Sequence, residues 1–206
     1  MREYIILPWR RIHWHYKDVT LLANNCIGGC ICHDLRLRFN SPFVNLWLAP
    51  KDFIKYCENI SHYRACALQF LPEESKVLHY PVALLDDIKI YFQHYHSYKE
   101  AEKKWIERTK RMDLSNIYCL MVERDGCTED DLLRFSALPY PSASLVHTKK
   151  LAKLPNTHYI PGFEKEKETG NVMEYVPNQY LGKKYYDSFN YIGWIHGKKN
   201  SDIRCL

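Results

Sequence analysis

A short apolar run that stops at two amides and is followed by a glycine pair constrains the fold most. Residues 19–33 read Val-Thr-Leu-Leu-Ala-Asn-Asn-Cys-Ile-Gly-Gly-Cys-Ile-Cys-His. The run Val19–Ala23 predicts a buried strand, and Gly28–Leu35 predicts a helix after a tight turn. In open α/β sheets such a junction binds ligands, because helix N–H groups and the carboxyl edge of the strand meet there. We therefore expect the turn 24–29 to form part of a ligand site.

Alternating strand and helix signals along residues 17–150 predict an α/β core. We expect a single three-layer domain with a mixed, largely parallel, Rossmann-like sheet. Residues 1–16 form a basic, aromatic lead-in, and residues 151–206 form an irregular C-terminal segment that packs on the core. The predicted strands are Val19–Ala23, Val44–Leu48, Lys76–Val82, Asp87–Gln93, Ile117–Val122 and Ala143–His147, and the predicted helices are Gly28–Leu35, Pro50–Cys57, Tyr98–Met112 and Thr128–Leu138.

The overall composition excludes several classes of protein. Of the 206 residues, 46% are hydrophobic and 14% aromatic, which is too apolar for a disordered chain. No apolar run approaches the roughly 18 residues of a membrane span, and the N-terminus lacks the apolar region of a secretion signal. The formal charge of +5 suits anionic ligands or a membrane surface, without a basic block for nucleic acid. We expect a cytoplasmic protein that does not bind nucleic acid.

The cysteines lie mostly in apolar surroundings, as small buried hydrophobes do in a reducing cytoplasm. The segment Cys26-x3-Cys30-x-Cys32-His33 has the residue types of a metal site, but its spacing differs from the paired Cys-x2-4-Cys ligands of structural zinc. We therefore predict no metal site there. The eight cysteines are Cys26, Cys30, Cys32, Cys57, Cys66, Cys119, Cys127 and Cys205.

The N-terminal segment combines cationic and aromatic side chains. Such an edge can lie on a bilayer interface as a peripheral membrane contact. The alternative is a helix that simply packs on the body of the protein. The residues concerned are Trp9, Trp14, Tyr16, Arg10, Arg11, His13 and His15.

The turn after the first strand has the residue types of a site for hydroxyl-rich or amide ligands. Asparagine side chains both donate and accept hydrogen bonds, and glycines let a ligand approach the backbone. The turn matches neither Gly-x-Gly-x-x-Gly nor a Walker loop, so no standard dinucleotide or ATP site is predicted. The alternative is that these residues only shape the turn. The candidate binding residues are Asn24, Asn25, Gly28 and Gly29.

Two further polar segments follow predicted strands. His94 leaves the strand Asp87–Gln93 and could act as a general base, because the pKa of histidine is near working pH. Arg124 and Asp125 follow the strand Ile117–Val122 at its carboxyl end, where catalytic groups collect. Asp125 could act as a base, bind sugar hydroxyls or hold a divalent metal, although no Asp-x-Asp motif implies metal dependence. The alternatives are a structural histidine and acids that complement a helix dipole.

Three cations form one stripe of the predicted helix Tyr98–Met112, which Ser97 and Glu100 begin as a capping box. One helix face with three cations could hold a diphosphate or a lipid phosphate. The alternative is a solvated face braced by Glu100 and Glu107. The three cations are Lys104, Arg108 and Arg111.

A set of motifs in order along residues 15–165 resembles a known bacterial family. The motifs are Asn24-Asn25-Cys26-x-Gly28-Gly29, Asn40-Ser41-Pro42 with Pro50-x-Asp52-Phe53, Tyr80-Pro81-Val82, Asp87-Ile88, His94-Tyr95-x-Ser97 with Glu100-Ala101-x-x-Lys104-Trp105-x-x-Arg108-x-x-Arg111, and Arg124-Asp125-Gly126-Cys127-Thr128. The chain resembles the "domain of unknown function 1919" family, whose members often carry the label exopolysaccharide or capsule biosynthesis protein, and some the label glycosyltransferase-like. The resemblance implies a bacterial protein of surface-polysaccharide assembly but supplies no established reaction or catalytic residues.

These observations lead to three functional hypotheses. The first is a glycosyltransferase that moves a sugar from an activated donor, such as a nucleotide sugar, to a lipid-linked or oligosaccharide acceptor, with His94 or Asp125 as base. The second is another polysaccharide-modifying enzyme, an acyl or phospho-group transferase, with Cys26 as nucleophile. That role requires a neighbouring base, for which the candidates are His33, His94 and His96. The third is a non-catalytic carbohydrate-binding or scaffold protein.

Overall fold

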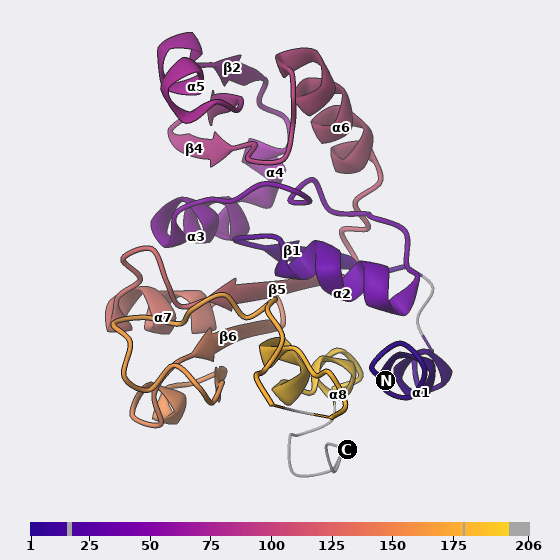
Figure 1. Ribbon diagram of the computed structural model, residues 1–206. Helices are drawn as coiled ribbons and strands as arrows, with labels where there is room; N and C mark the ends of the chain where they lie inside the picture. The colour runs from indigo at the N-terminus through magenta and orange to yellow at the C-terminus, as the bar shows by residue number, and fades with distance from the viewer. Residues whose placement is uncertain (16–17, 179, 198–206) are drawn as a thin grey trace.

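A parallel sheet forms the centre of the molecule in the computed structural model, which describes residues 1–15, 18–178 and 180–197 (Figure 1). Its four strands run in the order β1-β5-β6-β7, and every neighbouring pair is parallel. The predicted α/β class is therefore confirmed. The strands are β1 (Thr20–Ala23), β5 (Ile117–Val122), β6 (Ser142–Val146) and β7 (Thr157–Tyr159).

The antiparallel strands form a second, three-stranded sheet of their own, in the order β2-β3-β4. This small sheet lies between β1 and β5 in the chain, and Figure 1 shows it with α5 and α6 at the upper end of the view. Its elements and their neighbours are α3 (Pro50–Glu58), α4 (Ile60–Tyr63), β2 (Leu68–Phe70), α5 (Pro72–Leu78), β3 (Val82–Leu85), β4 (Ile88–Tyr91) and α6 (Tyr98–Lys110).

Two hydrophobic cores lie on opposite faces of the parallel sheet. Side chains alternate along its strands, so that Leu22, Cys119 and Met121 belong to one core, whereas Leu21 and Leu120 belong to the other. The first core is closed by the second sheet and by α3, α6 and α7 (Glu129–Ser136), and the other core by α2 (Ile27–Leu35), η2 (Tyr185–Ser188) and α8 (Tyr191–Ile195). The parallel sheet is therefore the middle of three layers. The short helix η1 (Leu151–Lys153) also packs against the first core.

Two predicted strands are wrong. Residues 44–48 contribute only an isolated bridge between Trp47 and Tyr91, because Asn45 has a left-handed backbone with a φ of 64° that interrupts any regular strand. Residues 76–78 are the end of helix α5, which begins at Pro72 and is capped by His79 with a φ of 61°, and only Val82 belongs to a strand. Proline in the first turn pre-sets helical φ and loses no intrahelical hydrogen bond, so it is a helix start that we did not use.

The helix α6 begins where the sequence predicts. The hydrogen bonds and ion pairs that Glu100 and Glu107 make differ from the predicted ones. The Ser97 hydroxyl accepts a hydrogen bond from the Glu100 N–H at 3.2 Å, as an N-cap should. The Glu100 carboxylate accepts from the N–H of His96 and not from that of Ser97, so the reciprocal capping box is not formed. Glu107 pairs with Lys104 at 3.6 Å. One face of this segment packs on the first core, where four of its residues are buried: Ala101, Trp105, Thr109 and Met112.

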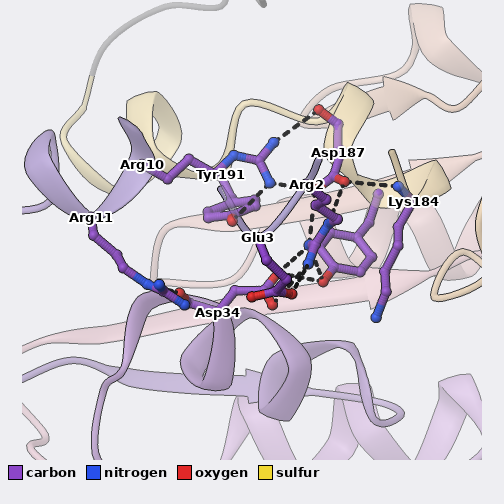
Figure 2. Close-up of polar contacts among 9 residues, drawn as sticks. Arg2, Glu3, Arg10, Arg11, Asp34, Lys184, Asp187 and Tyr191 are labelled. Atoms are coloured by element: carbon purple, nitrogen blue, oxygen red, sulfur yellow. Dashed lines mark hydrogen bonds and ion pairs between the residues drawn. The ribbon is translucent and has the colours of Figure 1, made fainter. Parts of the chain in front are cut away.

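A buried ion-pair network joins the N-terminal segment to the C-terminal segment (Figure 2). Arg2 donates hydrogen bonds to Asp34 of α2 at 3.1 Å and to Asp187 of η2 at 2.8 Å. Arg10, on the N-terminal helix α1 (Ile6–Ile12), binds the same Asp187 and donates to the Tyr191 hydroxyl at 3.0 Å. The network thus fixes α1 and the C-terminal segment against α2.

The outer surface of the N-terminal segment carries apolar side chains that pack on no core. Tyr4, Ile5 and Ile12 are 86%, 48% and 73% exposed. Tyr16, which we grouped with this segment, lies outside the described residues. No helix in residues 1–15, 18–178 and 180–197 is long and apolar enough to cross a bilayer.

Candidate functional site

A cleft of about 870 Å³ lies at the carboxyl edge of β1 and β5. Five regions of the chain line it: the β1–α2 turn with the start of α2, the segment before α3, the region from Tyr80 to His94, the loop after β5, and the C-terminal segment. The lining residues are Asn25, Cys26, Cys30, Asn45, Trp47, Tyr80, Gln93, His94, Arg124, Asp125, Asn171 and Met173. The structure therefore brings together four of the predicted site residues, Asn25, His94, Arg124 and Asp125.

Asn24 has a structural role next to the cleft, and its side chain does not line the cleft. Its side chain is buried, donates to the Val122 carbonyl at 3.1 Å and accepts from the Val122 N–H at 3.0 Å. This amide continues the ladder between β1 and β5 by one residue, so its polar atoms are used inside the protein. Its own carbonyl accepts from Leu48 at 2.9 Å, which holds the segment before α3 over the strand edge.

The two glycines of the turn have separate explanations. A Cβ on Gly28 would lie 3.0 Å from the Ala23 Cβ and 3.4 Å from the Leu21 carbonyl oxygen. Gly28 is therefore needed for the close packing of α2 on β1 and is not open to a ligand. Gly29 would meet only Val44, at 3.4 Å, and it lines a smaller pocket beside the cleft.

Asn25 and Cys26 begin α2 inside the cleft. The side-chain Oδ1 of Asn25 accepts from the Ile27 N–H at 3.0 Å, an Asx turn that leads into the helix. Burial raises the pKa of the Cys26 thiol to about 11, and the neighbouring Cys30 adds to this effect. Because the thiolate is the reactive form, this environment disfavours Cys26 as a nucleophile.

The loop after β5 turns sharply and presents Arg124 and Asp125 to the cleft. Asp125 and Gly126 both have left-handed backbones, with φ values of 57° and 80°. Aspartate tolerates this conformation better than most residues. The Arg124 Nε donates to the Asp125 carboxylate at 3.2 Å, and the two side chains are 30% and 37% exposed. Both charges therefore remain accessible to a ligand.

A buried cluster of polar side chains, which the sequence did not lead us to predict, holds the first residue of this loop in place. The Glu123 carboxylate contacts Nδ1 of His147 at 2.6 Å and accepts from the Thr169 hydroxyl at 2.9 Å. The Thr169 N–H donates to the Glu123 carbonyl at 2.8 Å. All three residues are buried, and they join the ends of β5 and β6 to the C-terminal segment. The usable signal was a polar residue at the end of each of two predicted core strands: Glu123 directly follows Ile117–Val122, and His147 is the last residue of Ala143–His147.

His94 reaches the cleft from the end of the second sheet. Its backbone N–H donates to the Asn45 carbonyl at 3.3 Å, and its side chain is exposed. Close by, the rings of Trp47 and Tyr91 stack with centroids 4.0 Å apart. The isolated Trp47–Tyr91 bridge therefore places both the Trp47 ring and His94 on the cleft.

The three cations of the predicted helix Tyr98–Met112 do not line the cleft. Arg108 is buried, and it donates to the Val44 carbonyl at 3.1 Å and to the Tyr95 hydroxyl. Arg111 donates to the Phe39 carbonyl at 2.9 Å. These two arginines fix the loop between α2 and α3, and Lys104 pairs with Glu107. We therefore withdraw the prediction that this face binds a diphosphate.

A different cation stands beside the cleft. A pocket of about 230 Å³ shares Cys26, Cys30 and Asn45 with the cleft and is also lined by Lys184. Figure 2 shows the Lys184 side chain directed away from Asp187, although its backbone N–H donates to that carboxylate at 2.8 Å. No motif in the sequence singled out Lys184, because it lies in the C-terminal segment among many other lysines.

No cluster of metal-ligand atoms is found at the cleft within the described residues. Cys32 is buried, whereas Cys26 and Cys30 are half-buried. All cysteines in the described part of the chain are free thiols, and Cys205 lies outside it.

Comparison with known proteins gives two findings. A family described as Domain of unknown function (DUF1919) matches residues 2–196. The chain is also 43% identical over 180 residues to an uncharacterized protein of Haemophilus influenzae, and this match covers 87% of the chain and 85% of the relative.

Proposed function

The chain belongs to the DUF1919 family, and on that premise we propose that it is a glycosyltransferase of bacterial surface-polysaccharide assembly. It moves a sugar from an activated donor to a saccharide acceptor in the cytoplasm, in the synthesis of exopolysaccharide, capsule or lipopolysaccharide. The observation that carries the proposal is the meeting of Asn25, His94, Arg124 and Asp125 in one cleft at the carboxyl edge of a parallel sheet.

The lining of the cleft supports a sugar as ligand. Four amide side chains line it, and amides both donate to and accept from hydroxyl groups. The rings of Trp47 and Tyr80 add apolar faces that also carry a polar group. The amides are Asn25, Asn45, Gln93 and Asn171.

Two cations support a phosphorylated donor. Arg124 lies in the cleft and Lys184 in the adjoining pocket, so a donor that spans both places its diphosphate between them. Arginine binds phosphate through several directed N–H groups, whereas lysine acts as a point charge. This pair replaces Lys104, Arg108 and Arg111 in our proposal for the donor site.

The reaction requires a base for the acceptor hydroxyl. The hydroxyl oxygen forms a bond to the anomeric carbon of the donor sugar, and the bond from that carbon to the diphosphate breaks. The proton of the hydroxyl passes to His94 or to Asp125, both of which are exposed in the cleft. Asn25 and Arg124 bind groups of the donor and take no part in the proton transfer.

A lipid-linked acceptor would account for the exposed apolar side chains of the N-terminal segment. Exposed Tyr4, Ile5 and Ile12 can enter the interface of a membrane while the buried side of α1 holds the body of the protein. We therefore include a peripheral contact with the inner face of the cell membrane in the proposal.

Thermal shift and turnover measurements test the proposal. A panel of nucleotide sugars is screened for an increase in melting temperature, and donors that bind are assayed for transfer to saccharide acceptors. Replacing the base should lower turnover by ~10²–10⁴-fold in His94→Ala or in Asp125→Asn. His96→Ala is the matched control, because His96 is exposed two residues further on and lies outside the cleft. Full turnover in both base variants would remove our assignment.

The two other hypotheses give different results in the same assays. Donor binding without turnover in the wild type would favour a carbohydrate-binding or scaffold protein. Loss of transfer in Cys26→Ser, with binding kept, would favour an acyl or phospho-group transferase that uses the thiol. The raised pKa of Cys26 leads us to expect that Cys26→Ser retains turnover.

A further inference from the structure

Three side chains with different ligand atoms meet on the surface of the second sheet, away from the cleft. The Nε2 atom of His62 lies 2.7 Å from a carboxylate oxygen of Asp86 and 3.7 Å from the sulfur of Cys66. The three ligand atoms all lie within 4.8 Å of one another, and no other group of three such residues occurs in residues 1–15, 18–178 and 180–197.

The backbone positions this group from two separate elements. His62 is in the short helix α4 and Cys66 follows four residues later, so both side chains lie on the same side of the segment. Asp86 is in the turn between β3 and β4, where its φ of 56° is left-handed. A ligand shared by the three would therefore connect the helical segment to the β3–β4 turn.

The neighbouring carboxylate leaves Asp86 available. Asp87 accepts hydrogen bonds from Lys55 at 2.7 Å and from the Tyr63 hydroxyl at 2.6 Å, so the adjacent acid is already neutralised. Among the described residues Asp86 pairs with His62 alone. The turn is thus held in place by Asp87 while Asp86 faces the imidazole and the thiol.

We propose that His62, Cys66 and Asp86 bind a zinc-class divalent cation. Tetrahedral zinc with Zn–S near 2.3 Å and Zn–N and Zn–O near 2.1 Å places its ligand atoms about 3.4–3.6 Å apart. The sulfur and imidazole nitrogen are already 3.7 Å apart, whereas the exposed Asp86 carboxylate, 2.7 Å from that nitrogen, must move away from it to admit the ion. A sulfur, a nitrogen and a carboxylate oxygen favour Zn²⁺ over Mg²⁺ or Ca²⁺, which prefer oxygen ligands alone. The His62 and Asp86 side chains are 46% and 54% exposed, so the fourth position faces water.

This site is separate from the proposed transferase function. None of the three residues lines the cleft. The bound ion joins α4 to the β3–β4 turn, and it is expected to stabilise the second sheet on which His94 depends for its position. The site is therefore tested by metal binding and stability, without any activity assay.

Cobalt and zinc titrations of the whole chain, with metal removed by chelator and without an affinity tag, test the proposal. Co²⁺ should bind at one equivalent with visible d–d bands and a thiolate-to-cobalt charge-transfer band, and Zn²⁺ should displace it. Cys66→Ser should abolish the charge-transfer band, and loss of any one ligand should weaken Zn²⁺ binding at least ~10-fold. Zn²⁺ should raise the melting temperature of the wild type, and His62→Gln and Asp86→Asn should largely lose that increase.

Matched variants decide where the metal binds. Cys30→Ser removes a half-buried thiol of the cleft, and His79→Gln removes another exposed imidazole of the second sheet. Cys205→Ser removes the thiol outside the described residues. All three should keep the band and the affinity. Undiminished binding in a folded Cys66→Ser protein, or loss of the band in Cys30→Ser or Cys205→Ser, would overturn the proposal.

Discussion

Asp187 is the acceptor on which the buried network of Figure 2 depends, and Asp187→Asn should strongly destabilise the fold. Its carboxylate accepts from Arg2 at 2.8 Å, from Arg10, and from the Lys184 N–H at 2.8 Å. The Asp187, Arg2 and Arg10 side chains are 1%, 4% and 9% exposed. The variant therefore leaves two buried guanidinium groups with only the charges of Asp34 and of Glu3, which is 3.9 Å from Arg2, among their described ion-pair partners.

Removing one partner of a buried ion pair costs about 3–5 kcal/mol of unfolding free energy. For a chain of this size each kcal/mol lowers the melting temperature by about 2–4 °C, so we expect a decrease of roughly 6–20 °C. Circular dichroism melts measure it. The control is Lys150→Gln, which breaks the exposed Lys150–Glu129 pair, 80% and 51% exposed. That loss should stay below about 1 kcal/mol. Equal losses in the two variants would refute the reasoning.

The pH dependence gives an independent check on Asp187. Burial by itself would raise the pKa of Asp187, but the hydrogen bond from Arg2 and the charge of Arg10 together lower it below the ordinary value. The stabilisation is therefore fully present above the unfolded pKa of about 3.9, and it is lost as the pH falls through the lower folded pKa. The difference in stability between wild type and Asp187→Asn should be constant near neutral pH and shrink below about pH 4. A difference that persists at lower pH would contradict the assignment.

Three further predictions concern the turn and the N-terminal segment. Gly28→Ala should cost about 1–3 kcal/mol in denaturant unfolding because its Cβ meets β1, whereas Gly29→Ala should be neutral or stabilising. Asn24→Ala should cost at least about 2 kcal/mol, since two buried backbone groups lose their partner; a loss below that of an exposed-site control would show that the ladder does not need the amide. Ile5→Ser combined with Ile12→Ser should reduce cosedimentation with anionic vesicles at least ~10-fold without changing the melting temperature, and unchanged binding would rule out this surface.

Local signals were sufficient wherever a few neighbouring residues decide the backbone. Thr128 caps α7 through a capping box with Asp131, as its position before an apolar stripe indicates. Pro50 starts α3 in the first turn. The segment 72–78 has the same signal in Pro72. We predicted a strand from Lys76 because we interpreted the nearby apolar residues as a strand pattern and did not use the proline as a helix start.

The edge of the sheet made part of the site predictable. Parallel strands end at a common edge, so Asn25 after β1 and Asp125 after β5 had to lie near one another once the strands were identified. His94 joins them although it follows a strand of the other sheet. That arrangement depends on the Trp47–Tyr91 bridge, which no local pattern encodes.

The sequence by itself determined the alternation of strands and helices, the turn at residues 24–29 and the family. Periodicity and capping are local properties, and a single chain displays them. Only the tertiary structure decided which polar groups are used inside the protein. Asn24 and Arg108 satisfy buried backbone groups, while the side chains of Asn25, Asp125 and Lys184 line the cleft or its adjoining pocket, where a ligand can contact them. The reason is that hydrogen-bond partners distant in the chain, and not residue type, determine whether a side chain is structural or available.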